Sequence, residues 1–270
     1  MDQAQLHRLR ALAPVFIWAP TQRCGTGLLQ RLVTSSREAL IFGEESHLTL
    51  EIPRSLIRCA RQAEKNDVLL RRLSGGDPSG WYVHVYPPSK SYHAALIDNF
   101  YTLAEVYDQS ARELGFRRWG TKFPGIHPQE LLVLAKLLPH ARHLIVFRDL
   151  VDVLRSVKSR GWVNRPADAM AYCTHWTNRL AAAMDHFSGD PRFRMIRYEQ
   201  LVGDPQMQAT EIASFLSLST VDVSVFSHRP NAPGDGYTPP TALTPRERQM
   251  IDDVAGSLRA KLGYPRLLAA

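Results

Sequence analysis

Residues 15–34 constrain the fold more than any other stretch of the chain. They begin with five apolar residues, VFIWA, whose length and β propensity predict a short buried strand. They end in apolar residues at helical spacing: Leu28, Leu29, Leu32 and Val33. Between the two, residues 20–27 contain two glycines and predict a tight turn. The pattern indicates a buried strand that turns directly into a helix.

A turn of this kind directs unpaired backbone N–H groups and the positive end of the helix dipole at one point. Such a point binds phosphate or sulfate, and glycine lets the backbone approach the anion closely. The turn is not a Walker A loop, because Gly25 is followed by Thr26 and Gly27, and its cation, Arg23, precedes the glycines. A glycine turn also occurs in ordinary strand-to-helix connections, so this turn alone leaves both interpretations open.

Strands and helices alternate along the rest of the chain. Apolar segments predict strands at 39–42, 117–122, 143–147 and 193–197. Helical patterns occupy 46–74, 91–114, 128–138, the region after Asp149 that carries Ser156 and Arg160, 166–187, 205–218, and a last helix capped by Thr244. This alternation predicts a mostly parallel sheet with right-handed crossovers. With 270 residues and no linker, we predict one α/β domain over 1–270, with the sheet flanked by helices in a P-loop-like, three-layer architecture.

The charge balance favours a small anionic ligand. The chain carries 33 Lys and Arg against 26 Asp and Glu, a net charge of +7, and these charges are spread rather than gathered in a tail. This distribution suits anion pockets better than a nucleic-acid surface, so we expect no nucleic acid partner. Three distant cysteines, Cys24, Cys59 and Cys173, form neither a metal-ligand pattern nor a disulfide framework. Without a signal peptide or a transmembrane segment of roughly 18 apolar residues, we expect a cytoplasmic protein.

Acidic and basic side chains follow two of the predicted strands. Glu44 and Glu45 come after the strand at 39–42, at the sheet edge where open α/β sheets bind ligands. They also suit the first turn of the next helix, where acidic side chains favour the dipole. Arg148 follows the strand at 143–147, and Ser156 and Arg160 are four residues apart in the predicted helix, so they share a face. Guanidinium and hydroxyl groups suit a phosphate, although a solvated helix face would show the same residues.

Three segments in this order resemble the family of sulfotransferases that use 3′-phosphoadenosine 5′-phosphosulfate (PAPS), especially its tyrosyl-protein and carbohydrate branches. They are RCGTGLL at 23–29, FRD at 147–149 with Ser156 and Arg160 beyond it, and RYEQL at 197–201. The GEE stretch at 43–45 also resembles the tyrosyl-protein branch. The resemblance extends from about residue 14 to 218. It implies an enzyme of the EC 2.8.2 type with PAPS as co-substrate, PAP as product and no metal.

The resemblance also implies roles for particular residues. The first loop would hold the 5′-phosphosulfate through Arg23, Cys24, Gly25, Thr26, Gly27 and Leu28. Arg148 and Ser156 match the residues that bind the 3′-phosphate, Arg160 matches a further basic contact, and Tyr198 matches a residue near the nucleotide. A tyrosine at position 198 would equally suit core packing.

The expected reaction moves the sulfuryl group in line to an acceptor hydroxyl. By resemblance, Glu45 is the general base with Glu44 as its rival, while Lys122 and Arg23 stabilise the charge on the departing PAP. A match to the C-terminal serine, lysine and tryptophan of the tyrosyl-protein enzymes is missing, so a carbohydrate, lipid or natural-product acceptor is expected. Residues 46–100 and 227–243 are the expected acceptor-side insertions. The sequence does not reveal the oligomeric state.

Two other functions remain open at this point. A P-loop nucleotide or metabolite kinase would share the strand, turn and helix, but the Gly-Lys-Ser/Thr ending is missing and no obvious Mg²⁺-binding acid follows a strand. A non-catalytic module that binds nucleotides or polyanions would share the basic pocket. Glu45 and Lys122 argue against that module, because binding alone does not require them.

Overall fold

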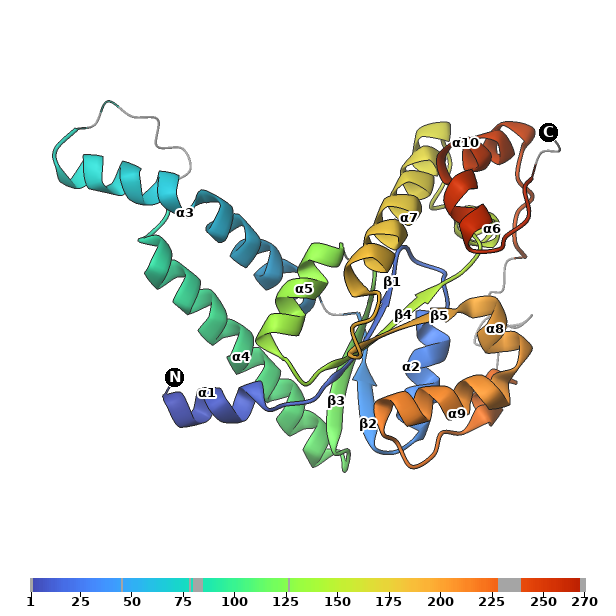
Figure 1. Cartoon of the computed structure of the whole chain (residues 1–270), viewed down its shortest axis with the longest axis horizontal. Helices are drawn as coiled ribbons and strands as arrows, with labels where there is room; N and C mark the ends of the chain where they lie inside the picture. The colour runs from blue at the N-terminus through green and yellow to red at the C-terminus, as the bar shows by residue number, and fades with distance from the viewer. Residues whose placement is uncertain are drawn as a thin grey trace.

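The structure is a computed structural model that describes residues 2–44, 46–77, 79, 85–125, 127–227 and 239–267. Its centre is a five-stranded sheet with the order β2-β3-β1-β4-β5, in which every pair of neighbouring strands is parallel (Figure 1). The strands are β1 (Val15–Ala19), β2 (Ala39–Phe42), β3 (Arg118–Pro124), β4 (Arg142–Phe147) and β5 (Phe193–Arg197). The predicted parallel α/β sheet flanked by helices is confirmed.

The helices follow the predicted alternation with the strands. They are α1 (Gln3–Arg10), α2 (Thr26–Ser35), η1 (His47–Glu51), α3 (Ile52–Ser74), α4 (Ser89–Glu113), α5 (Pro128–Leu137), α6 (Leu150–Lys158), α7 (Pro166–Phe187), α8 (Tyr198–Gly203), α9 (Pro205–Leu216), η2 (Val223–Phe226) and α10 (Pro245–Lys261). Local sequence sets the start of α10, where the predicted cap Thr244 forms a capping box with Glu247. None of the helices that the structure describes combines the length and apolar character needed to span a bilayer.

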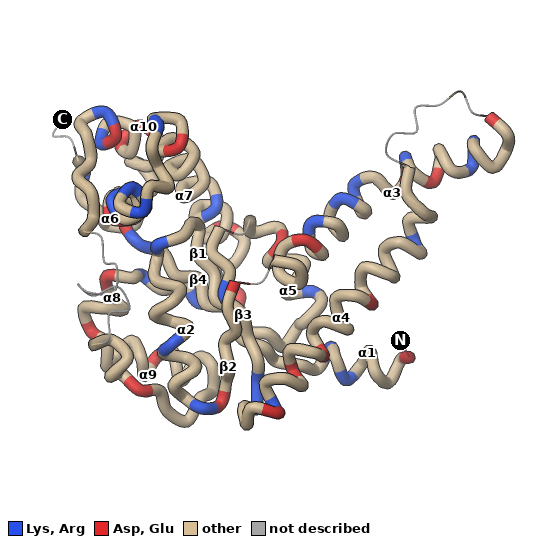
Figure 2. The backbone as a smooth tube through the Cα atoms, turned by 180° about the vertical axis from the view of Figure 1, so that it is seen from behind, with Lys and Arg blue, Asp and Glu red and all other residues tan. Residues whose placement is uncertain are grey.

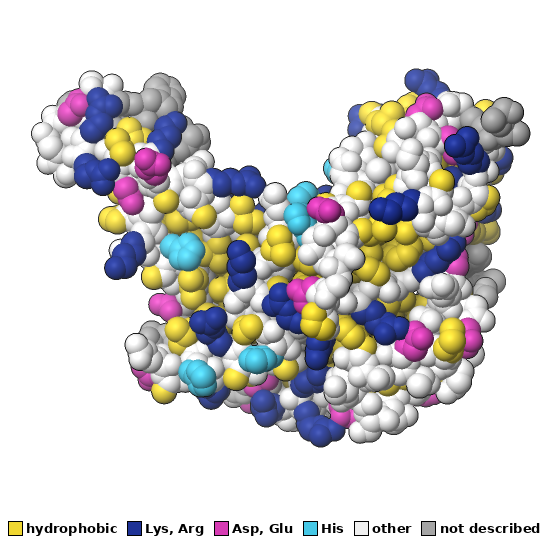
Figure 3. Space-filling model, in the orientation of Figure 1, with side chains coloured by type: hydrophobic (Ala, Val, Ile, Leu, Met, Phe, Trp, Pro, Cys, Tyr) yellow, Lys and Arg dark blue, Asp and Glu magenta, His cyan; other side chains and the backbone are white. Residues whose placement is uncertain are grey.

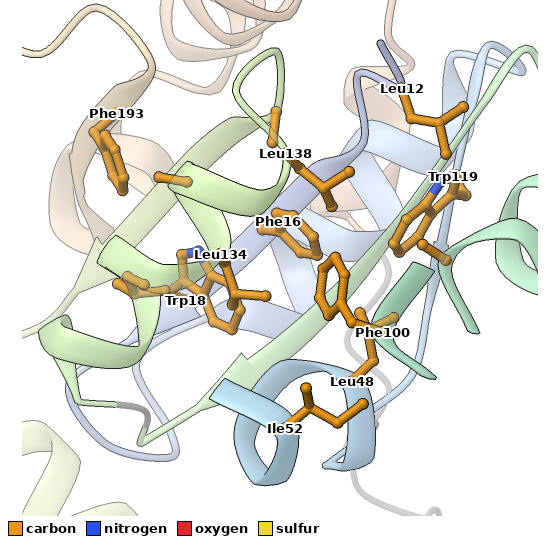
Figure 4. Packing of buried hydrophobic residues seen from close by; sticks show 14 of the residues in the cluster. Leu12, Phe16, Trp18, Leu48, Ile52, Phe100, Trp119, Leu134, Leu138 and Phe193 are labelled. Atoms are coloured by element: carbon orange, nitrogen blue, oxygen red, sulfur yellow. The ribbon is translucent and has the colours of Figure 1, made fainter. Parts of the chain in front are cut away.

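The central strand β1 supplies side chains to both faces of the sheet. Phe16 and Trp18 point to the face covered by α4 and α5, where they pack with Phe100 and Leu134 (Figure 4). The alternate residues of β1 point to the opposite face, which α2 and α9 cover. A third cluster, which includes Trp176, lies among α6, α7 and α10. These layers bury the sheet on both faces. They leave the carboxyl ends of the strands accessible to ligands.

The helices beyond the sheet form two walls above its carboxyl edge. Helices α3 and α4 pack against each other and project away from the sheet, while α7 and α10 stand on the other side (Figure 1). The space-filling view shows a deep hollow between the walls (Figure 3). The strand ends therefore lie at the floor of an open cleft.

Three predicted boundaries are corrected. Helix α6 ends at Lys158, so Arg160 lies in the following turn and not on the helix that carries Ser156. Strand β3 continues to Pro124, two residues past Lys122. Helix α9 ends at Leu216 because the next residue adopts a left-handed conformation that stops it. The expected acceptor-side insertions at 46–100 and 227–243 fall partly outside the described residues.

Candidate functional site

All five strands contribute to one edge of the sheet. The glycine loop follows β1, Arg148 follows β4, and Tyr198 follows β5. On the other side of β1, Lys122 lies near the end of β3 and Glu44 lies two residues beyond β2. In a parallel sheet the carboxyl ends of the strands lie together, so residues more than 150 positions apart surround one region.

The glycine loop presents free backbone donors at the start of α2. Gly25 is the N-cap residue, in the left-handed region at φ 112°. Its carbonyl accepts hydrogen bonds from the N–H groups of Leu28 and Leu29, at 3.1 and 3.2 Å. The N–H groups of Thr26 and Gly27 form no hydrogen bond with any described residue. Two donors at a helix N-terminus are thus available to an anion, as the sequence predicts.

Tyr198 stacks between the glycine loop and Arg148. A Cβ atom on Gly25 would lie 2.5 Å from Cδ2 of Tyr198, so only glycine fits beneath the ring. On the other side, the guanidinium carbon of Arg148 lies 4.6 Å from the ring centroid. Tyr198 therefore links the two segments that, by resemblance, are expected to hold opposite ends of the nucleotide.

The Arg148 guanidinium is only partly neutralised. Its Nη2 lies 3.4 Å from Oδ2 of Asp152, whose other oxygen, Oδ1, lies 3.5 Å from Nη1 of Arg155. Its Nε is buried and has no hydrogen-bond partner among the described residues. About a quarter of the Arg148 side chain is nevertheless exposed, so the outer part of its guanidinium is accessible to an anion.

Arg23 and Ser156 come into direct contact. Nε of Arg23 donates a hydrogen bond of 3.0 Å to Oγ of Ser156. Burial lowers the pKa of Arg23, and the positive charges of Arg160 and Arg148 lower it further. The three arginines therefore lie close enough to repel one another, and an anion between them would relieve that repulsion. Arg160 remains in this cluster although it lies beyond the end of α6.

The remaining side chains of the glycine loop point into the protein. The Cys24 side chain is fully buried beside Thr21, and burial raises the pKa of its thiol to about 11. Thr26 is buried, and Leu28 packs against the cluster under α2. For Cys24 and Leu28, only the backbone faces the region of the predicted anion.

Lys122 pairs with the first of the two predicted acids. Its Nζ lies 2.7 Å from Oε1 of Glu44, and the lysine side chain is largely buried whereas Glu44 is half exposed. Glu45, the predicted base, lies outside the described residues. His47 is exposed and its Nδ1 lies 2.9 Å from Oε2 of Glu51. The structure thus joins Lys122 to the acidic stretch after β2.

A buried ion pair behind the site was missed by sequence reasoning. Arg259 on α10 is 1% exposed and donates from Nε and Nη2 to the two carboxylate oxygens of Asp149, at 3.0 and 3.1 Å. Its Nη1 also lies 3.5 Å from Oδ1 of Asp252. Asp149 stands beside Arg148 in a predicted motif, but no local pattern identifies its partner. The pair holds the turn that carries Arg148.

A second acid from the predicted motifs completes this support. Glu199 accepts hydrogen bonds from the backbone N–H of Asp149 and from the hydroxyl of Tyr264, both at 2.9 Å. Burial and the charge of Glu199 raise the pKa of Tyr264. The Arg197 guanidinium carbon lies 4.0 Å from the Tyr264 ring centroid. These contacts fix the ends of β4 and β5 relative to each other.

Comparisons with known proteins agree with this arrangement. The family profile described as "Sulfotransferase family" matches residues 14–222. The sulfotransferase domain from the curacin biosynthetic pathway superposes with a TM-score of 0.52 at 16% identity, covering 94% of this chain and 98% of that one. Mouse sulfotransferase SULT7A1, solved in complex with PAP, gives a TM-score of 0.53 at 12% identity, with 97% and 93% covered.

The sulfotransferase domain from the Synechococcus PCC 7002 olefin synthase gives a TM-score of 0.50 at 17% identity, covering 90% of this chain and 96% of that one. A search of curated protein sequences finds no significant match. At these identities the structural likeness speaks for the fold alone, whereas the profile match covers well over half of the 270 residues. The chain belongs to the sulfotransferase family.

Proposed function

We propose that this sulfotransferase uses PAPS and moves its sulfuryl group to a hydroxyl of a carbohydrate, lipid or natural-product acceptor. The observation that carries the proposal is the cluster of three arginines, Arg23, Arg148 and Arg160, around Ser156, in which Arg23 donates to the Ser156 hydroxyl and Arg148 is partly exposed. PAPS has two separate anionic ends, and the site has two sets of donors. The free N–H groups of the glycine loop suit the phosphosulfate, and Arg148 with Ser156 suits the 3′-phosphate.

Positioning and charge stabilisation would supply most of the catalysis. The acceptor oxygen forms a new bond to sulfur while the bond from sulfur to the bridging phosphate oxygen breaks, so negative charge builds on PAP. Arg23 and Lys122 would stabilise that charge, since both cations stand at the same sheet edge. The acceptor loses its proton to a base, for which a carboxylate contributes roughly 10²–10⁴-fold in rate.

Glu45 is the proposed base and Glu44 its rival. Glu44 already uses one carboxylate oxygen to hold the Lys122 ammonium at 2.7 Å, which suits a residue that orients the lysine. The proton would then pass from the acceptor hydroxyl to the neighbouring carboxylate of Glu45. Replacing each acid by glutamine separates the roles: Glu45→Gln should abolish turnover with PAP affinity nearly unchanged, and the same result for Glu44→Gln would exchange the two assignments.

Thermal unfolding with different ligands tests the donor. PAP, ATP with Mg²⁺ and heparin represent the sulfotransferase, the kinase and the polyanion-binding module. PAP at 100 times its Kd should stabilise the fold by about 2.7 kcal/mol. Arg148→Ala should abolish this effect, whereas Arg248→Ala, an exposed arginine on α10, should leave it intact. Stabilisation by ATP with Mg²⁺ or heparin but not by PAP would reject the proposal. Transfer from labelled PAPS to a panel of hydroxyl compounds then identifies the acceptor.

A further inference from the structure

A basic groove lies between α3 and α5, on the wall of the cleft opposite α7 and α10. Figure 2 shows Lys and Arg gathered along the part of α3 nearest the sheet. The groove has a cavity of about 330 Å³. Its polar lining consists mainly of Arg54, Arg58 and Arg61 from α3 and His127, Gln129 and Glu130 from the start of α5.

The three arginines share one face of α3 and exceed the acidic charge available to them. Positions 54, 58 and 61 are four and three residues apart, so their side chains project to the same side. Arg54 pairs with Glu130, which is 4% exposed and also caps α5. Arg61 donates to Oε1 of Gln129 at 2.8 Å. No described residue forms a hydrogen bond or ion pair with the Arg58 guanidinium. One acid thus faces three cations.

Arg179 lies between the groove and the residues that precede the glycine loop. Nη1 of Arg179 donates to the carbonyl of Pro20 at 3.1 Å, and a Cβ on Gly125, directly after β3, would lie 3.3 Å from the same Nη1. That Cβ would also lie 3.9 Å from Nε2 of Gln22. His127, which lines the groove, follows Gly125 by two positions. Because the charge of Arg54 also acts on Arg179, the groove and the glycine loop lie on either side of this one arginine.

The positive charge of Arg54 influences the titration of Arg179 and His127 at the inner end of the groove. Burial lowers the pKa of Arg179, and the charge of Arg54 lowers it further against the opposing effect of Glu130. Burial also lowers the pKa of His127, with added contributions from Arg179 and Arg54. His127 is therefore neutral near pH 7, and the arginines alone supply the charge.

We propose that this groove binds an anionic group of the acceptor, so that the preferred substrate is a hydroxyl compound that also carries a carboxylate, sulfate or phosphate ester. The inference rests on the proposed function, because it assigns a substrate class to the same cleft. Guanidinium groups bind such oxyanions through paired N–H donors, and Arg58 with Arg61 can supply a set of donors that no other described side chain neutralises. An exposed helix face with no ligand is the alternative that the experiment must exclude.

Direct binding of labelled probes tests the inference without requiring turnover. The probes are a neutral disaccharide, the same disaccharide with one uronic acid, and its sulfate monoester, each measured with PAP at saturation. NaCl at 0.15 M limits charge effects to about 8 Å. We expect at least one anionic probe to bind tenfold or more tightly than the neutral parent. The two anionic probes distinguish a carboxylate from a sulfate ester as the recognised group.

Two matched variants decide whether the groove is responsible. Arg58→Glu should remove the preference for the anionic probe. Arg71→Glu makes the same charge change on the same helix, about 20 Å further along its axis, and should retain the preference. Equal binding of all probes, no binding of either anionic probe, or equal losses in the two variants would overturn the inference. PAP affinity measured on the same samples reports separately on the proposed function. If PAP does not bind the unmodified protein, PAPS is rejected as the donor.

Discussion

The guanidinium of Arg259 and the carboxylate of Asp149 form two parallel hydrogen bonds, of 3.0 and 3.1 Å, inside the protein. This contact joins the last helix to the turn after β4, 110 positions earlier in the chain. Asp149 also caps α6 through the N–H of Val151 at 3.1 Å. The position of Arg148 thus depends on a residue that is distant along the chain.

Replacing Arg259 should therefore destabilise the fold. We expect Arg259→Met to lower the free energy of unfolding by about 3 kcal/mol, since it leaves the largely buried Asp149 carboxylate without its charged partner. Urea unfolding followed by circular dichroism measures the change. Arg248→Met, an exposed residue of the same helix, should change stability by less than about 0.5 kcal/mol. Equal effects of the two substitutions would mean that the ion pair contributes nothing.

Gly25 should tolerate no side chain. Gly25→Ala would place a Cβ 2.5 Å from the Tyr198 ring at φ 112°, so we expect at least a tenfold loss of PAP affinity by calorimetry. Gly25→Ala should also lower the free energy of unfolding. Adding Tyr198→Ala removes the clash but leaves the backbone strain of roughly 1–2 kcal/mol, so the double variant should recover only part of that free energy. Gly256→Ala, within α10, should stabilise the protein slightly, because a Cβ there would meet only Asp252 at 4.0 Å. Unchanged affinity in Gly25→Ala would show that the loop does not bind the ligand.

Lys122 should affect turnover more than binding. We expect Lys122→Met to reduce kcat about 10²–10³-fold with the Kd of PAP changed only a few-fold, because the charge that it stabilises develops in the transition state. Steady-state transfer from labelled PAPS and calorimetry with PAP give the two quantities. Lys136→Met, an exposed lysine on α5, serves as the control. A parallel fall in PAP affinity would instead make Lys122 a binding residue.

The three cysteines should differ in reactivity. Burial raises the pKa of Cys24 to about 11 and that of Cys173 to about 12, and both side chains are buried. The thiolate is the reactive form, so at pH 8 iodoacetamide should modify the partly exposed Cys59 first. Mass spectrometry of peptides measures each site. Modification of Cys24 at the rate of Cys59 in the folded protein would contradict its burial.

His143 should make stability depend on pH. It accepts a hydrogen bond of 3.0 Å at Nδ1 from Trp18, and burial lowers its pKa to about 3. The unfolded chain binds a proton there below about pH 6.5, but the folded protein does not until about pH 3. Its contribution to the free energy of unfolding is therefore complete above pH 6.5 and is lost progressively as the pH falls from 6.5 to 3. At pH 5 the loss is about 2 kcal/mol.

Urea unfolding at pH 8 and pH 5 tests this dependence. His143→Leu should remove that part of the loss, whereas replacement of the exposed His93 by Leu should not. An identical pH dependence in the unmodified protein and in His143→Leu would show that this histidine is not responsible.

Local sequence patterns predicted those parts of the candidate site that lie within one continuous segment of the chain. The strand, the glycine turn and the helix over 15–34 are continuous in sequence, so apolar spacing and two glycines suffice to predict them. The alternation of strands and helices also places Arg148 at the same edge of a parallel sheet, and its proximity to Arg23 follows. The helix containing Ser156 was predicted too long, because nothing in residues 159–161 except Gly161 signals an end at Lys158.

Contacts between distant segments could not be read in this way. Arg259 looks like an ordinary charged residue of an exposed helix until α10 packs beside α7 and buries it. The groove between α3 and α5 likewise depends on how two helices pack, and Arg54 gives no sign in sequence of its bond to Glu130. Such features require the tertiary arrangement, since propensity and periodicity report only on neighbours along the chain.

The hydrogen bond from Arg23 to Ser156 closes a span of 133 residues. It can form only when β1 and β4 have already paired, because each residue follows one of those strands. Closing so long a span is a late and slow event for a parallel sheet. A ligand held by both residues would therefore slow the unfolding of the finished protein and leave its refolding rate almost unchanged.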